Sequence, residues 1–152
     1  MARLDFSFFH TLRVRWAEVD MQAIVFNGHY LTYFDVAFTE YWRATGLPNA
    51  LEQAKTGKEL FARKATVEYF APSGFDDVLD IGVRCVKLGN SSMQFSLEIY
   101  RGEQHVVTGE LFYVYADTSI RKGLAIPDSW RAIIKAIETT KPIDLASPDY
   151  YE

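Results

Sequence analysis

One carboxylate stands in a stretch of sequence that is otherwise uncharged at neutral pH. Asp20 opens the run D-M-Q-A-I-V-F-N-G-H-Y, which leads into a long apolar segment. Taken alone, such an aspartate is more often a turn or capping residue, because its carboxylate accepts hydrogen bonds from nearby backbone amides. The alternative is a catalytic carboxylate that faces a helix N-terminus, where free amides and the positive end of the helix dipole would stabilise an oxyanion.

Motifs of other common enzymes are missing from the chain. There is no G-x-S-x-G elbow, G-x-G-x-x-G, phosphate loop, H-E-x-x-H or paired C-x-x-C. His10, His29 and His105 are too scattered to suggest a zinc site, so we expect neither a metal nor a cofactor. Carboxylates and backbone amides are left for catalysis. Glu18 could pair with Asp20 as acid and base, but a glutamate in this position is more often exposed or paired with an arginine.

A long buried helix is predicted directly after Asp20. From about Gly28 the apolar residues include i, i+3, i+4 spacing but spread beyond one stripe, which is typical of a helix buried nearly all round. Gly46, followed by Leu47 and Pro48, predicts its end, because glycine adopts the left-handed conformation and proline cannot continue the helix. We expect roughly 16 to 18 residues and a length on the order of 25 Å.

Alternating apolar and polar residues predict five strands around this helix. They lie at residues 6–16, 59–70, 77–88, 93–101 and 104–116. Short turns join the last three into an antiparallel meander. The last strand is apolar on both faces, so each face must be covered. The central helix covers one face, and a C-terminal helix opening at Pro127 or a second subunit must cover the other, which favours a homo-oligomer.

The run that begins at Asp20 resembles the 4-hydroxybenzoyl-CoA thioesterase family of the hotdog fold. The family pattern is Asp, two residues, Gly, two branched apolar residues, an aromatic residue, three variable residues and Tyr. The matching residues are Asp20, Ile24, Val25, Phe26 and Tyr30. Later segments are also similar, so the resemblance covers most of residues 8–138. Ala23 occupies the place of the glycine, which puts a positive φ or a very close ligand approach at that point in doubt.

The resemblance implies an α+β hotdog domain, in which an antiparallel sheet of about five strands wraps a long central helix and an extra C-terminal helix follows. One domain would span residues 1–152, with a core at about 8–138 and a tail at 141–152. The implied activity is hydrolysis of an acyl- or aryl-CoA thioester by a homodimer or homotetramer. Asp20 would be nucleophile or general base, with backbone amides near Asn27 and Gly28 holding the oxyanion.

Substrate-binding residues are expected to form an apolar, partly aromatic pocket and a rim of cationic and hydroxyl groups for the anionic part of CoA. The predicted residues are Val25, Phe26, His29, Tyr30, Phe34, Phe61, Arg63, Lys87, Ser91 and Ser92. Other hotdog thioesterases carry their carboxylate on the central helix. Asp35 and Glu40 are therefore alternatives to Asp20.

Composition and charge argue against several other classes of protein. The chain has 152 residues, the size of one domain, and its 15% aromatic content suggests a pocket or an interface. A net charge of -4 without a Lys/Arg-rich run argues against nucleic-acid binding. Because there is no signal peptide, no 18-residue apolar run and a single cysteine, Cys85, we expect a cytoplasmic protein without a membrane partner.

Two other functions stay open at this point. A hotdog dehydratase or hydratase usually needs a histidine paired with an acid across a dimer, and His29 with Asp35 is a weak candidate. A non-catalytic acyl-binding or assembly module could use the same groove. Release of free CoA from saturated acyl-CoA distinguishes the hydrolase from both.

Overall fold

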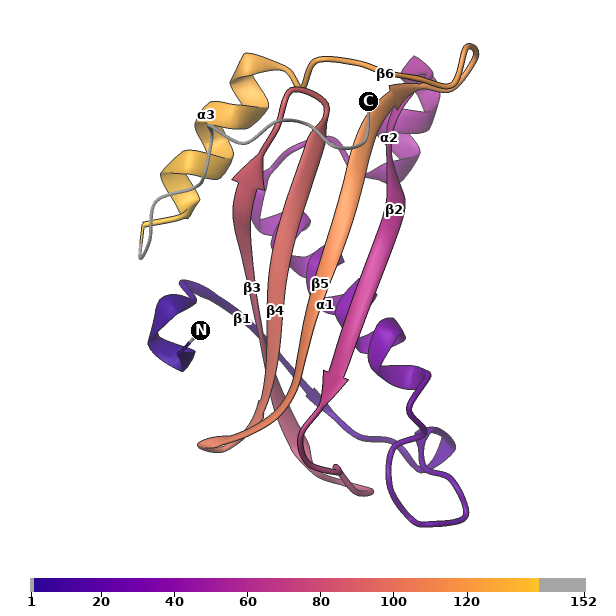
Figure 1. Cartoon of the computed structure of the whole chain (residues 1–152), viewed down its shortest axis with the longest axis vertical. Helices are drawn as coiled ribbons and strands as arrows, with labels where there is room; N and C mark the ends of the chain where they lie inside the picture. The colour runs from indigo at the N-terminus through magenta and orange to yellow at the C-terminus, as the bar shows by residue number, and fades with distance from the viewer. Residues whose placement is uncertain (1, 140–152) are drawn as a thin grey trace.

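An antiparallel sheet of six strands forms the body of the protein (Figure 1). The computed structural model describes residues 2–139, and the predicted tail at 141–152 lies outside them. The strand order is β1-β3-β4-β5-β2, and a short β6 pairs with β5. The strands are β1 (Phe8–Arg13), β2 (Lys58–Tyr69), β3 (Val78–Leu88), β4 (Ser92–Arg101), β5 (Gln104–Asp117) and β6 (Lys122–Gly123).

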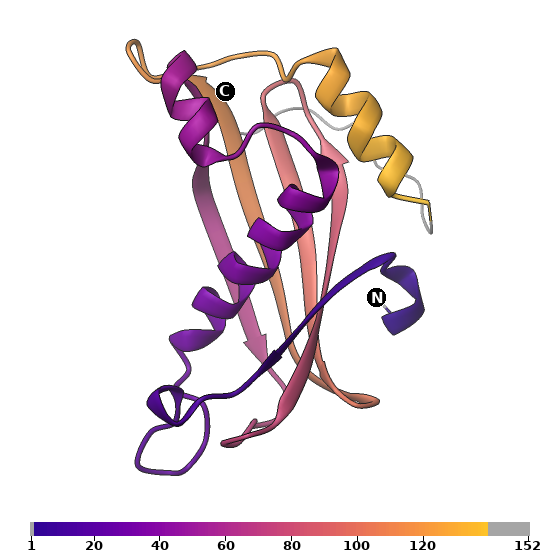
Figure 2. The same ribbon diagram turned by 180° about the vertical axis from the view of Figure 1, so that it is seen from behind.

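One long helix, α1 (His29–Thr45), runs obliquely across one face of this sheet (Figure 2). Its 17 residues confirm the predicted length. The helix ends at Gly46, which has a φ of 73° and donates its N–H to the carbonyl of Arg43. A long helix covered by a curled antiparallel sheet is the hotdog arrangement that the sequence predicted.

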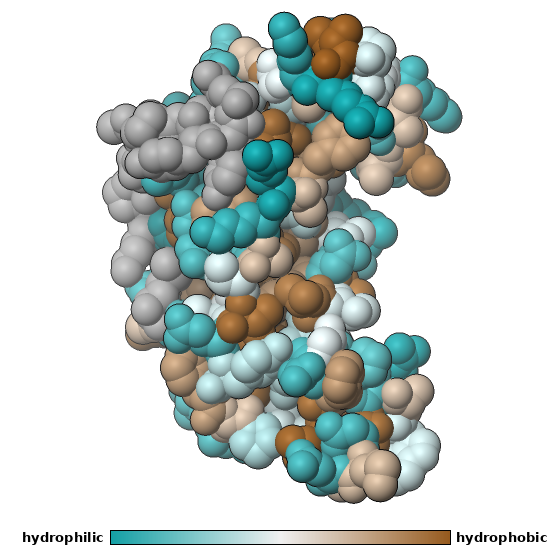
Figure 3. Space-filling model, turned by 45° about the vertical axis from the view of Figure 1, so that its right-hand side comes forward, coloured by the Kyte–Doolittle hydropathy of each residue, from teal (hydrophilic) through white to brown (hydrophobic). Residues whose placement is uncertain are grey.

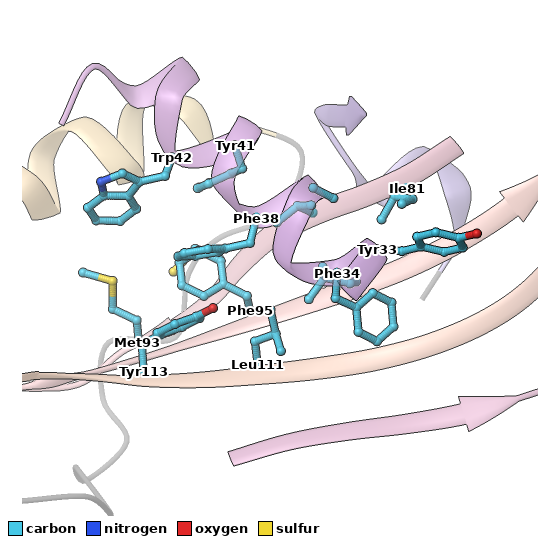
Figure 4. Close-up of a cluster of buried hydrophobic side chains, with 14 of the residues drawn as sticks. Tyr33, Phe34, Phe38, Tyr41, Trp42, Ile81, Met93, Phe95, Leu111 and Tyr113 are labelled. Carbon is cyan, nitrogen blue, oxygen red and sulfur yellow. The ribbon is translucent and has the colours of Figure 1, made fainter. Parts of the chain in front are cut away.

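Aromatic side chains of α1 fill the space between the helix and the sheet (Figure 4). Phe38 stacks on Tyr113 with ring centroids 4.4 Å apart, and Phe95 meets Phe38 edge-on at 5.0 Å. The ring of Phe34 lies against the backbone of Gly109, where an added Cβ would be only 2.1 Å from the ring. Only glycine permits this approach, so the helix lies close to β5 at that point.

Two shorter helices lie near the end of the sheet that carries β6 (Figure 1). α2 (Ala50–Thr56) begins with a capping box, in which Asn49 and Glu52 bind each other's backbone amides. α3 (Asp128–Ile137) places Trp130 against Trp42 of α1 and Tyr115 of β5. The predicted C-terminal helix is therefore confirmed, and it packs beside the C-terminal part of α1.

The outer face of β5 is already covered within one protomer. Val106 and Val114 are buried, and Phe112 is half-buried with the ammonium group of Lys64 5.1 Å from its ring centroid. The apolar character of both faces of β5 therefore does not by itself require a second subunit. The homo-oligomer expected from the sequence stays a prediction.

A β-bulge in β2 reverses the predicted orientation of Phe61. The register with β5 shifts between Ala62 and Lys64. The extra residue breaks the alternation that would place Phe61 on the same side as Ala65. Phe61 instead pairs with Val114 on the outer face, and 46% of its surface is exposed. Strict alternation along residues 59–70 predicts that Phe61 and Ala65 share one side of the strand, and the bulge makes that prediction wrong.

A buried carboxylate joins the end of α3 to α1 and β3. Glu138 Oε1 accepts hydrogen bonds from the Tyr41 hydroxyl (2.7 Å) and the Cys85 amide (3.2 Å). Glu138 Oε2 is buried and has no hydrogen-bond partner among the described residues. Burial raises the pKa of this carboxyl, and the two donors and nearby Arg84 offset only part of that effect.

The stability of the Glu138→Gln variant relative to the parent is expected to increase as pH rises. A carboxyl with a raised folded-state pKa stabilises the fold below its unfolded pKa, and this contribution is lost as pH rises through the folded pKa. Between about pH 4 and about pH 7, the difference in unfolding free energy should therefore move toward the variant. Urea unfolding at each pH measures it, and a difference independent of pH would contradict the prediction.

Candidate active site

The loop between β1 and α1 forms a short hairpin whose tip carries Asp20. A 3-10 turn, η2 (Trp16–Glu18), leads into it. The first arm of the hairpin is residues 18–20 and the second arm is residues 24–28. Val19 on the first arm forms a β-bridge with Val25 on the second. The Asp20 N–H donates to the carbonyl of Ile24 at 2.9 Å. Backbone hydrogen bonds therefore hold the segments before and after the tip side by side.

The tip itself is a tight turn from Asp20 to Ala23. The Ala23 N–H donates to the carbonyl of Asp20 at 2.9 Å, and Ala23 has a φ of 62°. The positive φ that the sequence put in doubt is present. The hydrogen bonds of the hairpin offset the roughly 1–2 kcal/mol that left-handed backbone costs an L-residue.

The two oxygens of the Asp20 carboxylate differ in their hydrogen bonding. Its Oδ1 accepts the N–H of Gln22 at 2.8 Å, which is a turn-forming hydrogen bond. Its Oδ2 has no hydrogen-bond partner among the described residues, and the side chain is half-buried. One oxygen therefore shapes the turn, and the other is available to a reactant.

The N-terminus of α1 continues the second arm of the same hairpin. The Phe26 N–H donates to the carbonyl of Glu18 (3.0 Å), and the His29 N–H donates to the carbonyl of Phe26 (2.9 Å). Between them lie the amides of Asn27 and Gly28, which make no hydrogen bond within residues 2–139. These are the amides predicted to hold an oxyanion, and they stand at the positive end of the helix dipole.

The hairpin is fastened to β2 and to the loop that follows it. The Val25 N–H donates to the carbonyl of Ser73 at 2.8 Å. The Tyr69 hydroxyl donates to the carbonyl of Asn27 at 3.1 Å. The second arm is therefore held by the end of β2 as well as by the helix that it starts.

Of the residues predicted to bind substrate near Asp20, two are accessible in one protomer. Phe26 is exposed and His29 is half-buried, with ring centroids 5.7 Å apart. Val25, Tyr30 and Phe34 belong to the core, and burial raises the pKa of the Tyr30 phenol. Within one protomer these three position the hairpin and the helix.

Phe61 and Arg63 lie in the first half of β2, a strand that begins at the end of the sheet away from the Asp20 hairpin (Figure 1). They line an open depression of about 1140 Å³ on the outer face. Arg121 and Lys122, in the hairpin that leads into β6, line it as well. Arg121 and Lys122 were not among the predicted residues, because no local pattern links them to residues 61–63.

Lys87, Ser91 and Ser92 lie around the turn between β3 and β4. Both serines are buried in one protomer, and Ser92 pairs with Val114, which lines the depression. The structure therefore gathers residues predicted for the CoA rim at one end of the sheet. It does not bring them next to Asp20 within one chain.

Glu18 is buried, with 8% of its surface exposed, and is held by Arg15. The arginine pairing is confirmed, and the alternative of an exposed glutamate is wrong. Glu18 belongs to a 3-10 turn, so the strand geometry that would align it with Asp20 does not hold.

The two helix carboxylates lie in different surroundings. Glu40 pairs with Arg43 on the surface of α1, which lowers the pKa of Glu40. Asp35 lines a second cavity of about 360 Å³ between α1, α2 and β2. His29 and Asp35 are six residues apart on one helix, so they lie on different faces and do not pair within one protomer.

Neither a metal centre nor a bilayer-spanning helix is present in the part of the chain that the structure describes. Within residues 2–139, no group of three or more His, Cys, Asp or Glu side chains is placed to hold a metal ion. The described helices are all too short or too polar to cross a bilayer.

Comparison with known protein families identifies the family of this chain. The model of the thioesterase superfamily matches residues 22–108, which is more than half of the sequence. The chain belongs to the thioesterase superfamily. It is a thioester hydrolase on this basis. The match confirms the predicted fold and the predicted membership of the hotdog thioesterases. The narrower assignment, to the 4-hydroxybenzoyl-CoA subfamily, stays a prediction.

Relatives of this superfamily member include named enzymes and solved structures. Acyl-CoA thioester hydrolase YbgC of Escherichia coli O6:H1 is 28% identical over 119 residues, 78% of this chain and 88% of the relative. A hypothetical protein of Aquifex aeolicus has a similar structure, with a TM-score of 0.77, 26% identity and coverage of 84% and 99%. A thioesterase of Thermus thermophilus complexed with coenzyme A and Zn shares the fold, with a TM-score of 0.80, 24% identity and coverage of 91% and 98%.

Proposed function

We propose that this thioesterase hydrolyses an acyl- or aryl-CoA to free acid and CoA, with Asp20 as the catalytic group. The observation that carries the proposal is the hairpin, because the available oxygen of Asp20 and the free amides of Asn27 and Gly28 belong to its two arms. A carbonyl held between them would meet a nucleophile or base and two oxyanion donors. The activity named for YbgC supports the acyl-CoA class, and the buried free thiol of Cys85 suits the cytoplasm, where we place the enzyme.

Two sequences of bond changes fit this geometry. In the first, Asp20 Oδ2 bonds to the carbonyl carbon, the C–S bond breaks with CoA leaving as the thiolate, and water hydrolyses the mixed anhydride. In the second, Asp20 takes a proton from a water whose oxygen attacks the carbonyl carbon, and the proton passes to the departing sulfur. In both, the amides of Asn27 and Gly28 donate to the carbonyl oxygen as its negative charge develops.

A homodimer formed through β2 would complete the site. β2 is an edge strand of 12 residues, and its central residues 61–65 are all exposed. A long exposed edge is a template for pairing with another chain. Figure 3 shows the molecule deeply recessed along one side between two projecting ends. These features support pairing between the β2 strands of two copies, and association of two such dimers would give the alternative tetramer.

Antiparallel pairing would bring the depression of the second copy to the Asp20 hairpin. The Tyr69 end of one β2 would then lie beside the Lys58 end of the other. Tyr69 holds the hairpin through Asn27, and the depression begins near the Lys58 end with Glu59. The cationic residues that line this depression are Arg63, Arg121 and Lys122, and they are the proposed partners of the anionic part of CoA.

The proposed activity is tested by incubating the purified protein with a panel of saturated fatty acyl-CoAs and aryl-CoAs. We expect free CoA, detected with a thiol reagent, and one equivalent of the free acid. Binding without release of CoA would identify a non-catalytic acyl-binding module. Hydration of an enoyl-CoA without thiol release would identify the dehydratase or hydratase alternative.

A further inference from the structure

Glu18 is the most heavily hydrogen-bonded side chain in the Asp20 hairpin. Its Oε1 accepts the backbone N–H of Arg15 at 2.8 Å, and its Oε2 accepts the Arg15 guanidinium at 2.8 and 3.0 Å. The hydroxyl of Tyr33 donates to Oε1 at 3.0 Å, and this bond is buried. Burial acts to raise the pKa of Glu18, but the bonds from Arg15 and Tyr33 together lower it, so the acceptor is a carboxylate.

Tyr33 supplies the link between this carboxylate and α1. It lies in the second turn of the helix and is buried beside Tyr30, with ring centroids 5.7 Å apart. Burial and the Glu18 carboxylate raise the pKa of the Tyr33 phenol, so it stays protonated and donates. Among the described residues, this is the one side-chain hydrogen bond from α1 to the first arm of the hairpin.

The backbone of Glu18 joins the two arms. Its carbonyl accepts the N–H of Phe26 at 3.0 Å. Asp20 follows two residues after Glu18, and Gly28 follows two residues after Phe26. The position of Asp20 relative to Gly28 therefore depends on Glu18, whose backbone joins the two arms and whose side chain is hydrogen-bonded to the helix.

We propose that the hydrogen bond between Tyr33 and Glu18 is the positioning contact that sets Asp20 against the oxyanion amides. The proposal rests on the proposed function of Asp20. Arg15 cannot replace this contact, because 78% of its side chain is exposed and an exposed ion pair contributes little. Without Tyr33 the first arm could tilt away from the helix, and a displacement of about 1 Å in a reacting group can lower the rate by about 10²-fold.

The test is Tyr33→Phe, which removes one hydroxyl and keeps the ring in the core. We expect kcat for acyl-CoA hydrolysis to fall by about 10²-fold, while KM changes by less than about twofold because the substrate-binding groups are untouched. The matched control is Tyr100→Phe. Tyr100 is also buried and also donates to a glutamate, Glu98, but on the outer face of the sheet. The Tyr100→Phe variant should lose thermal stability and keep the kcat of the parent.

A second variant shows whether the two side chains act as one contact. Glu18→Leu, which has no acceptor oxygen for the Tyr33 hydroxyl, should lower kcat in the same way. The double variant Glu18→Leu, Tyr33→Phe should be no worse than the poorer single variant, because each change removes the same interaction. Additive losses would overturn the proposal. If Tyr33→Phe does not fold, the kcat of Glu18→Leu decides in its place.

The outcomes separate this proposal from the function of Asp20 itself. Folded Tyr33→Phe with the parent's kcat overturns the positioning role, and so does an equal loss in Tyr100→Phe. If Asp20→Asn is inactive in the same assay, only the positioning role has failed. If Asp20→Asn keeps the parent's kcat, the proposed function fails whatever the Tyr33 variant does.

Discussion

Asp20→Asn is expected to lower kcat by about 10²- to 10⁴-fold, the scale of losing a positioned acid, base or nucleophile. The structure makes this exchange selective. Asn retains an oxygen that can accept the N–H of Gln22, so the turn can stay intact. The melting temperature and the oligomeric state should therefore stay near those of the parent. Steady-state kinetics at saturating acyl-CoA, with thermal unfolding of the same samples, measures both.

The matched control for this variant is Asp5→Asn. Asp5 also accepts a backbone amide within a turn, that of Ala2 at 2.7 Å, but it lies in the N-terminal 3-10 turn. It should keep the parent's kcat. An Asp20→Asn protein with near-parent kcat would end the proposed role, and Asp35, which lines the second cavity, would be the next carboxylate to exchange.

Ala65→Glu is expected to weaken the proposed dimer strongly. Ala65 lies near the middle of β2 and is exposed in one protomer, so the isolated chain should tolerate the charge. In a β2 pair, a carboxylate from each copy would lie near the symmetry axis. Like charges brought together in an interface cost several kcal/mol, and about 3 kcal/mol is roughly a 10²-fold rise in the dissociation constant. Hydrolysis should fall with dissociation, because the depression of the second copy would be lost.

Sedimentation velocity across a dilution series measures this effect, with activity assayed at each concentration. Ala136→Glu is the control, since Ala136 is an exposed alanine on α3, away from β2. We expect the parent and the control to show no stable monomer at micromolar concentration. A parent that sediments as a folded and active monomer there would remove the shared-site proposal.

Local sequence patterns predicted the long helix and the strands, and the family resemblance implied their hotdog arrangement. The apolar spacing after Gly28 and the glycine at 46 predicted α1 almost to its observed ends, because both act within a few residues. Features that depend on strand register were not predictable in this way. The bulges near Arg63 in β2 and Val86 in β3 each add one residue against the partner strand, and no local signal marks them.

The same holds for the candidate site: residues that are close in sequence were predicted, and contacts between distant residues were not. Asp20, Asn27 and Gly28 lie within nine residues, so one motif could identify all three. The contact between Glu18 and Tyr33 is a side-chain hydrogen bond across 15 residues, and the sequence favoured only the arginine partner of Glu18. Arg63 and Arg121 meet at one depression through the pairing of β2 with β5, which single-strand patterns do not reveal.

Gly109 sets the height of α1 above the sheet. The ring of Phe34 occupies the volume that a Cβ at 109 would fill, so the helix rests on bare backbone. Phe34 lies within two helical turns of Gly28, so the distance of α1 from the sheet at Phe34 also fixes the position of the amides at the start of the helix. The position of the proposed oxyanion donors therefore depends on a strand that is distant in sequence. A side chain at position 109 would have to displace the buried ring of Phe34, and with it the contact that holds α1 close to β5.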